Sequence, residues 1–184
     1  MPEQDITGAP PRRLIVAAAV VAIVLAAGIA VAGIYATSTT STPTSGPLAL
    51  PSVPAPQANS PECTKLLAAM PGELLSNGAH LARRELAAPA PAATMAWGGT
   101  DQADPIVLRC GLDRPPELTP DAQLRVVSGV QWLPVEGQGQ ASWYVVDRDV
   151  YVALTVPDTA GTGPLQQTSD TVSAQLPPAP LRFG

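Results

Sequence analysis

The longest apolar run in the chain covers residues 14–36, LIVAAAVVAIVLAAGIAVAGIYA, and contains no charged residue. A helix rises about 1.5 Å per residue, so a helix of this length just crosses the hydrocarbon core of a bilayer. The pattern therefore predicts a single transmembrane helix. A cleaved secretory signal peptide is the alternative, because Ala30-Val31-Ala32 offers small residues of the kind that signal peptidase accepts. The run nevertheless exceeds the roughly 7 to 15 apolar residues of a signal peptide.

The charges that flank this run predict its orientation. Arg12 and Arg13 precede it directly, and the next basic residue is Lys65. Cytoplasmic flanks of membrane helices are enriched in Lys and Arg. We therefore expect residues 1–13 to form a cytosolic tail. The chain would be a single-pass protein of the cell membrane, with its C-terminal part outside the cytoplasm.

Residues 37–60, TSTTSTPTSGPLALPSVPAPQANS, carry no charge and are rich in Ser, Thr and Pro. Such a segment has too few large apolar side chains to build a core of its own. We expect a disordered linker here. The remaining residues, 61–184, are enough for one compact extracytoplasmic domain.

Helical periodicity returns at the start of this domain. Ser60 is placed as an N-cap before Pro61, and Leu66, Leu67 and Met70 form an apolar stripe, so a helix should begin at Pro61 and stop before Pro71. The next stretch, 72–86, has two interpretations. Its leucines suit a second short helix, whereas the Asn-Gly pair at positions 77 and 78 indicates a break.

Beyond residue 93 the pattern changes to short runs rich in β-branched and aromatic residues. Residues 142–156, SWYVVDRDVYVALTV, predict a hairpin with Asp147-Arg148-Asp149 as its turn, and both carboxylates of the turn are expected in solvent. A final helix is predicted from 163 to about 176. Together the elements predict an α+β fold, an antiparallel sheet packed by N- and C-terminal helices. The other predicted strands cover residues 94–97, 106–110, 124–127 and 130–135.

The chain has two cysteines, Cys63 and Cys110. Side chains alternate along a strand, so Cys110 shares the apolar face of Ile106 and Leu108, while Cys63 lies within one helical turn of Leu66. Two cysteines in an exported domain are most simply one disulfide. A zinc site would lack ligands, because the chain adds only one histidine, His80. A Cys-His nucleophilic pair is formally available.

Other candidate chemistry is sparse. No GxSxG motif occurs, and GQGQ at 137–140 has no following Lys-Ser or Lys-Thr, so it indicates a hairpin loop and not a phosphate-binding loop. The net charge of -5 argues against nucleic acid as a partner. No cofactor and no metal are expected.

Four residues are candidates for binding. Trp97, Trp132 and Trp143 are the largest apolar side chains in the predicted domain and should build its core by default. An exposed tryptophan among them could stack on a sugar ring or anchor a partner protein. Arg109 is a cationic position that could meet an anionic group.

Five segments occur in a telling order: PECTKLLAAMPGEL, MAWGG, DPIVLRCGL, VVSGVQWLPVE and VVDRDVYVALTVP. With the preceding apolar run and Pro/Thr-rich spacer, this series resembles an actinobacterial, mycobacterium-like family of membrane-anchored extracytoplasmic proteins that is known only as a domain of unknown function. The resemblance implies a cell-envelope protein. It implies no activity, cofactor or partner.

These observations favour a membrane-anchored envelope protein whose domain binds a protein or a cell-wall polymer without converting it. The spacer and anchor suit presentation of a binding domain, and each catalytic constellation lacks a member. The alternative is a cell-wall hydrolase or transferase that uses a carboxylate together with Arg109. An exposed cleft with two acids would favour the enzyme, and an apolar patch would favour binding.

Overall fold

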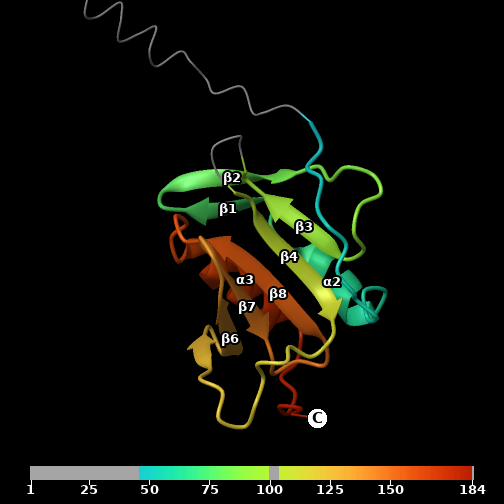
Figure 1. Cartoon of the computed structure of the whole chain (residues 1–184), viewed down its shortest axis with the longest axis vertical. Coiled ribbons are helices and arrows are strands. Elements are labelled where there is room, and N and C mark those ends of the chain that lie inside the picture. The colour runs from blue at the N-terminus through green and yellow to red at the C-terminus, as the bar shows by residue number, and fades with distance from the viewer. Residues whose placement is uncertain (1–45, 100–103, 184) are drawn as a thin grey trace, which may run out of the picture. The chain divides into compact units, whose positions relative to one another are not determined.

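The computed structural model describes residues 46–99 and 104–183. Within them the chain forms an eight-stranded antiparallel sheet of order β1-β2-β3-β4-β8-β7-β6-β5 and two helices (Figure 1). This confirms the predicted small domain of antiparallel sheet and flanking helices. The helices are α2 (Pro61–Ala69) and α3 (Gly163–Gln175), and the strands are β1 (Glu73–Ser76), β2 (Ala79–Arg84), β3 (Thr94–Trp97), β4 (Ile106–Leu112), β5 (Arg125–Val127), β6 (Val130–Glu136), β7 (Gln140–Val145) and β8 (Tyr151–Pro157).

The sheet buries apolar side chains on both faces. Both helices pack on one face, where Leu66 of α2 and Val172 of α3 join Trp97 and Trp132 in the larger core cluster. The opposite face carries a smaller cluster built around Leu133. Residues outside the strands that pack into this second cluster include Ala55, Leu118, Ala122 and Leu181. Because both faces are covered, β4 and β8 are apolar almost throughout.

Helix α2 forms where its sequence signals predict it. The Ser60 hydroxyl oxygen accepts a hydrogen bond from the Cys63 amide at 3.1 Å, and Pro61 occupies the first turn, where no backbone donor is needed. The helix ends at Ala69, before Pro71. Its buried positions, Cys63 and Leu66, are one turn apart and therefore share the face that meets the sheet.

The stretch after α2 is a β-hairpin, so its helical interpretation is wrong. Strands β1 and β2 are joined by Asn77 and Gly78, whose φ angles are 49° and 81°. Two successive residues with positive φ give the turn type whose twist matches a two-residue hairpin. The leucines of this stretch follow strand alternation, and Leu74 is buried while Leu75 is exposed.

Residues 46–58 form a segment that we call the N-terminal strap, which runs along β3 and β4 to α2 (Figure 1, cyan). Leu48 pairs with Leu86 in a parallel bridge, and Arg84 donates to the Gly46 carbonyl at 3.1 Å. Farther along, the Gln57 amide donates to the Gly111 carbonyl at 3.0 Å. The predicted disordered linker over 37–60 is therefore wrong for its described part. The strap has no core of its own, but its backbone bonds to the sheet.

The predicted transmembrane helix at 14–36 and the cytosolic tail at 1–13 lie outside the described residues. Within residues 46–99 and 104–183, neither helix reaches the length and hydropathy that a membrane span requires.

Candidate functional site

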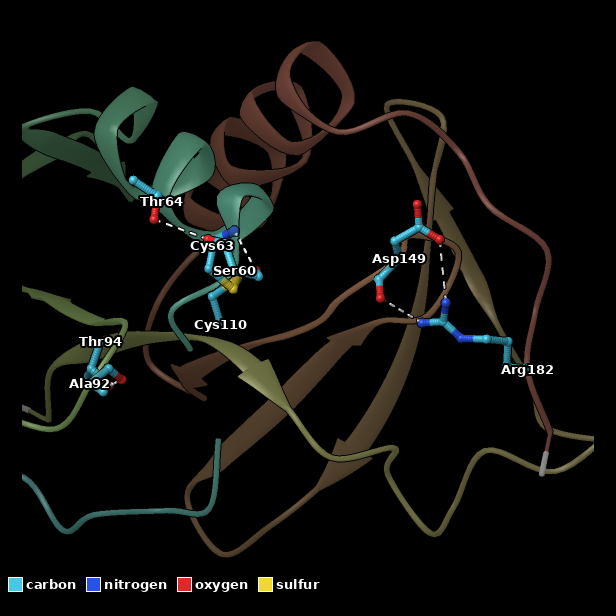
Figure 2. The surroundings of a disulfide bond; sticks show 8 residues. All are labelled: Ser60, Cys63, Thr64, Ala92, Thr94, Cys110, Asp149 and Arg182. Atoms are coloured by element: carbon cyan, nitrogen blue, oxygen red, sulfur yellow. Dashed lines mark hydrogen bonds and ion pairs between the residues drawn. A yellow bond between two sulfur atoms is a disulfide. The ribbon is translucent and has the colours of Figure 1, made fainter. Parts of the chain in front are cut away.

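Cys63 of α2 and Cys110 of β4 form the predicted disulfide (Figure 2). Their Cα atoms are 5.6 Å apart, and neither residue is exposed to solvent. Cys110 is therefore a covalent link between helix and sheet and not a nucleophile. His80 lies elsewhere, on the β1–β2 hairpin, where its Nδ1 is 3.3 Å from a Glu73 carboxylate oxygen. Among the described residues, no three His, Cys, Asp or Glu side chains gather as a metal site would require.

Two of the three tryptophans belong to the core. Trp97 and Trp132 have no exposed surface. The Trp97 indole donates to the Pro71 carbonyl at 3.0 Å, and the Trp132 indole donates to the Ser169 hydroxyl at 2.9 Å. Each indole thus ties the sheet to a segment on its helical face. Neither side chain has surface or hydrogen-bonding capacity left with which to meet a partner.

Trp143 of β7 is the tryptophan that solvent reaches. It lies on the helical face of the sheet, opposite Leu154 of β8, at the margin of the larger core. Beside it is a hollow of about 240 Å³, which we call the Trp143 hollow. Its apolar lining residues include Trp143, Val156, Pro157, Ala160 and Leu165.

The rim of the Trp143 hollow is acidic. Glu136 at the end of β6 and Asp158 after β8 both line it and are exposed, and no Lys, Arg or His is among its lining residues. Within the described part of the chain, neither carboxylate forms an ion pair. The lining of the hollow therefore combines one aromatic side chain, several aliphatic side chains and two carboxylates that form no ion pair within the described residues.

The loop that closes the hollow, residues 157–162, is fixed by the β1–β2 hairpin. The Asn77 side-chain amide donates to the Thr159 carbonyl at 2.9 Å, and the Ser76 hydroxyl accepts from the Gly161 amide at 3.3 Å. A Cβ at position 161 would lie 2.3 Å from the Asn77 side-chain oxygen, so a larger residue there would displace the Asn77 side chain. The wall of the hollow is thus held in place by contacts between segments more than 80 residues apart in the sequence.

Arg109 lies on the opposite face of the sheet. It pairs with Ala153 of β8, which in turn pairs with Tyr144 of β7, and Tyr144 and Trp143 point to opposite faces as neighbours in a strand must. The structure therefore does not bring Arg109 and Trp143 into one site. The Arg109 guanidinium donates to the Pro51 carbonyl of the strap at 3.2 Å.

Burial shifts the pKa values of two residues on this second face, Arg109 and Tyr144. Removal from water lowers the pKa of Arg109, an effect that nearby Tyr144 opposes. Burial also raises the pKa of Tyr144, and the negative charge of Glu117 adds to this. A hollow of about 230 Å³ lies beside Tyr144, and strap residues Val53 and Pro54 form part of its wall. The strap thus contacts Arg109 through Pro51 and lines the hollow beside Tyr144.

The β7–β8 turn overturns the expectation that both of its carboxylates are solvated. Asp149 is exposed, but Asp147 is buried with Arg148, whose guanidinium lies 2.9 Å from the Asp147 carboxylate. Asp147 also accepts from the Gln131 amide at 3.0 Å. The C-terminal segment contacts the turn, since Arg182 donates to the Arg148 carbonyl. The Arg182 guanidinium also lies 3.4 Å from the Asp149 carboxylate (Figure 2). Asp147 therefore connects the turn to β6 through the Gln131 amide, and the Arg148 carbonyl connects the turn to Arg182 near the C-terminus.

Sequence reasoning identified Trp143 but missed Glu136, Asp158 and Tyr144. Glu136 is the last residue of β6 and Asp158 directly follows β8, and no spacing links the two acids to each other or to Trp143. Their proximity results from the pairing of β6, β7 and β8 together with the start of α3. No local signal could have identified them.

One family model, described as a protein of unknown function (DUF3515), matches residues 19–181. No curated protein and no solved structure matches the chain.

Proposed function

The chain belongs to this family of unknown function, and we propose that it is a membrane-anchored extracytoplasmic protein whose domain binds a protein or cell-wall partner through the Trp143 hollow. In this proposal residues 14–36 are the anchor, and the envelope is that of an actinobacterium. The observation that carries the binding role is an accessible tryptophan in a preformed hollow with an unpaired acidic rim.

The disulfide supports the extracytoplasmic location. Disulfides persist in oxidising compartments and are rare in the cytosol, and the Cys63–Cys110 bond is wholly buried in the domain core. The arginines before the apolar run favour the same orientation.

Geometry favours binding over the hydrolase or transferase alternative. That alternative needs Arg109 beside a catalytic carboxylate, but Arg109 lies on the opposite face of the sheet from the two acids of the hollow. A carboxyl that acts as a general acid is usually taken out of water by its surroundings. Glu136 and Asp158 are both exposed.

Site-specific photo-crosslinking in living cells tests this proposal. The full chain would carry p-benzoylphenylalanine in place of Thr162, an exposed residue that lines the hollow, or in place of Ala174, an exposed residue of α3 that does not. We expect a discrete adduct from position 162 only. This adduct should weaken when Trp143→Leu is added, because leucine retains apolar volume but not the aromatic face.

Equal adducts from positions 162 and 174, or none from either, would count against a binding role for the hollow. The location is tested separately by joining a reporter enzyme after Gly184. We expect activity from a reporter that requires export. Activity from a reporter that works only in the cytoplasm would refute the orientation.

A further inference from the structure

We infer that the Trp143 hollow receives a single lysine or arginine side chain of a partner protein. This inference rests on the proposed function and specifies the chemistry of the group that is bound. The aliphatic stem of the side chain would lie along Val156 and Leu165. Its cationic head would lie between Glu136 and Asp158, where the positive charge also faces the Trp143 ring.

The size of the hollow selects a side chain and not a larger ligand. Its volume is about 240 Å³, whereas sites for cofactors and drug-sized molecules occupy about 300–1,000 Å³. A lone protruding side chain fits such a space and leaves the rest of the partner on the surrounding surface. Buried aromatic and arginine contacts of this kind supply most of the energy at protein interfaces.

The lining selects a long cationic side chain. Lysine and arginine pack their methylene stems on apolar surface while the charged head meets polar groups, and tryptophan is the best aromatic partner for a cation. A neutral apolar side chain would cover Glu136 and Asp158 without pairing them, which costs desolvation energy. A sugar ring would meet mainly hydrocarbon, two carboxylates and the Thr162 hydroxyl, with few of the paired donors and acceptors that its own hydroxyls need.

The charge balance around the hollow supports the same choice. Helix α3 begins at Gly163, beside the rim, and a helix N-terminus carries a partial charge of about +0.5. The two negative charges of Glu136 and Asp158 together exceed this partial positive charge. The chain as a whole carries a net charge of -5, so its long-range field also attracts basic partners.

Indole NMR signals give a direct test with short peptides. The full chain, labelled with ¹⁵N-tryptophan and held in non-ionic detergent, would be titrated with acetyl-Gly-Gly-X-Gly-Gly-amide, where X is lysine, arginine, norleucine or glutamate. The chain has three tryptophans, and a Trp143→Phe variant assigns the signal of Trp143. Trp97 and Trp132 are internal controls, because both indoles are buried and hydrogen-bonded.

We expect the lysine and arginine peptides to shift the Trp143 signal in a saturable way while the other two signals stay in place. The norleucine peptide, which keeps the stem and lacks the charge, should bind about fivefold to tenfold more weakly. The glutamate peptide should cause no shift. Equal saturation by norleucine and lysine, or no shift with either cationic peptide, would overturn the inference.

A charge-matched pair of variants separates local contact from net charge. Glu136→Gln with Asp158→Asn removes both rim charges, and Glu85→Gln with Asp170→Asn removes two charges from exposed acids that do not line the hollow. We expect the first variant to bind the lysine peptide about tenfold more weakly, since each exposed pair contributes modestly. The second should bind as wild type does. Equal weakening in both would show that only the overall field acts.

The two proposals fail in different ways. If position 162 forms its adduct but the peptides do not discriminate charge, the hollow binds a partner by another chemistry and the inference alone is wrong. If the peptides discriminate charge and no adduct forms in cells, the cation site stands and the proposed binding function is wrong.

Discussion

Asp147 and Arg148 are the charged residues that the described part of the domain buries most completely. Burial removes both from water, which is costly unless they pair with good geometry. The direct contact of 2.9 Å and the Gln131 amide offset that cost. Asp149, two residues after Asp147, offers a natural control, because it pairs with Arg182 in solvent.

Substitution of the two aspartates should have very different effects. Asp147→Asn leaves the Arg148 charge buried without its counter-ion and should lower the free energy of unfolding by about 3–5 kcal/mol. Asp149→Asn breaks only an exposed pair and should cost at most about 1 kcal/mol. Urea denaturation of both variants beside the wild type measures this. Similar losses from the two would contradict the buried pair as a determinant of stability.

Tyr144 should make the free energy of unfolding of the domain depend on pH in the alkaline range. Its pKa is raised in the folded domain above the ordinary value of 10.0, so as pH rises the unfolded chain loses this proton first. Stability that is fully present below pH 10.0 should therefore decline as pH rises toward the folded-state pKa. Tyr144→Phe removes this contribution and should flatten the decline. Denaturation midpoints measured across this range test the sign, and an unchanged slope in the variant would refute it.

At the scale of elements, β4 is where the strap, the disulfide and the sheet meet. The register of β4 with β8 shifts between Cys110 and Leu112, and Gly111 at the shift has a φ of 81°. An added Cβ at this residue would lie 2.3 Å from the carbonyl carbon of Gln57. Glycine at position 111 therefore permits both the local bulge and the close approach of the strap.

Gly78 distinguishes the effect of the positive φ from the effect of the close contact with the strap. Its φ is also 81°, but an added Cβ there would meet nothing within 4 Å. Gly78→Ala should thus cost only the backbone strain, about 1–2 kcal/mol. Gly111→Ala should cost clearly more, because the strap must also move. Unfolding free energies of both variants decide the matter, and equal losses would mean that the strap does not constrain β4.

At the scale of the whole molecule, the disulfide joins α2 to the centre of the sheet across 47 residues of sequence. Closing a loop of that length reduces the freedom of the unfolded chain and should stabilise the fold by about 4 kcal/mol. The Cys63→Ser, Cys110→Ser double variant should lose about that amount in denaturant unfolding. It should still bind the lysine peptide once folded, because the cysteines lie in the core and do not line the Trp143 hollow.

Thiol chemistry gives the complementary result. The wild type should show no free thiol when denatured without reductant, and its two cysteine peptides should be recovered joined. An alkylatable Cys110 in the native protein would contradict the bond, and with it the main structural support for an exported domain.

Local sequence signals determined the elements whose stability depends on near neighbours. The cap of α2 and the apolar face shared by Cys110, Ile106 and Leu108 follow from spacings of a few residues. The Asn77-Gly78 pair marked a break in the same way, but the signal left helix and strand open on either side of it. The disulfide belongs to the same group, because two cysteines on apolar faces of one domain have each other as the natural partner.

The tertiary structure alone decided which surfaces remain open. Trp132 and Trp143 both lie on strands, and both side chains face the helical side of the sheet. Trp132 is buried and bonded to Ser169 of α3, whereas Trp143 lies at the margin of the core. The strap was unpredictable for the same reason, because its hydrogen bonds go to residues at the end of β2 and in β4, 38 to 58 positions away for the two arginine contacts. Contacts between such distant segments depend on how the whole chain packs, and no local pattern records them.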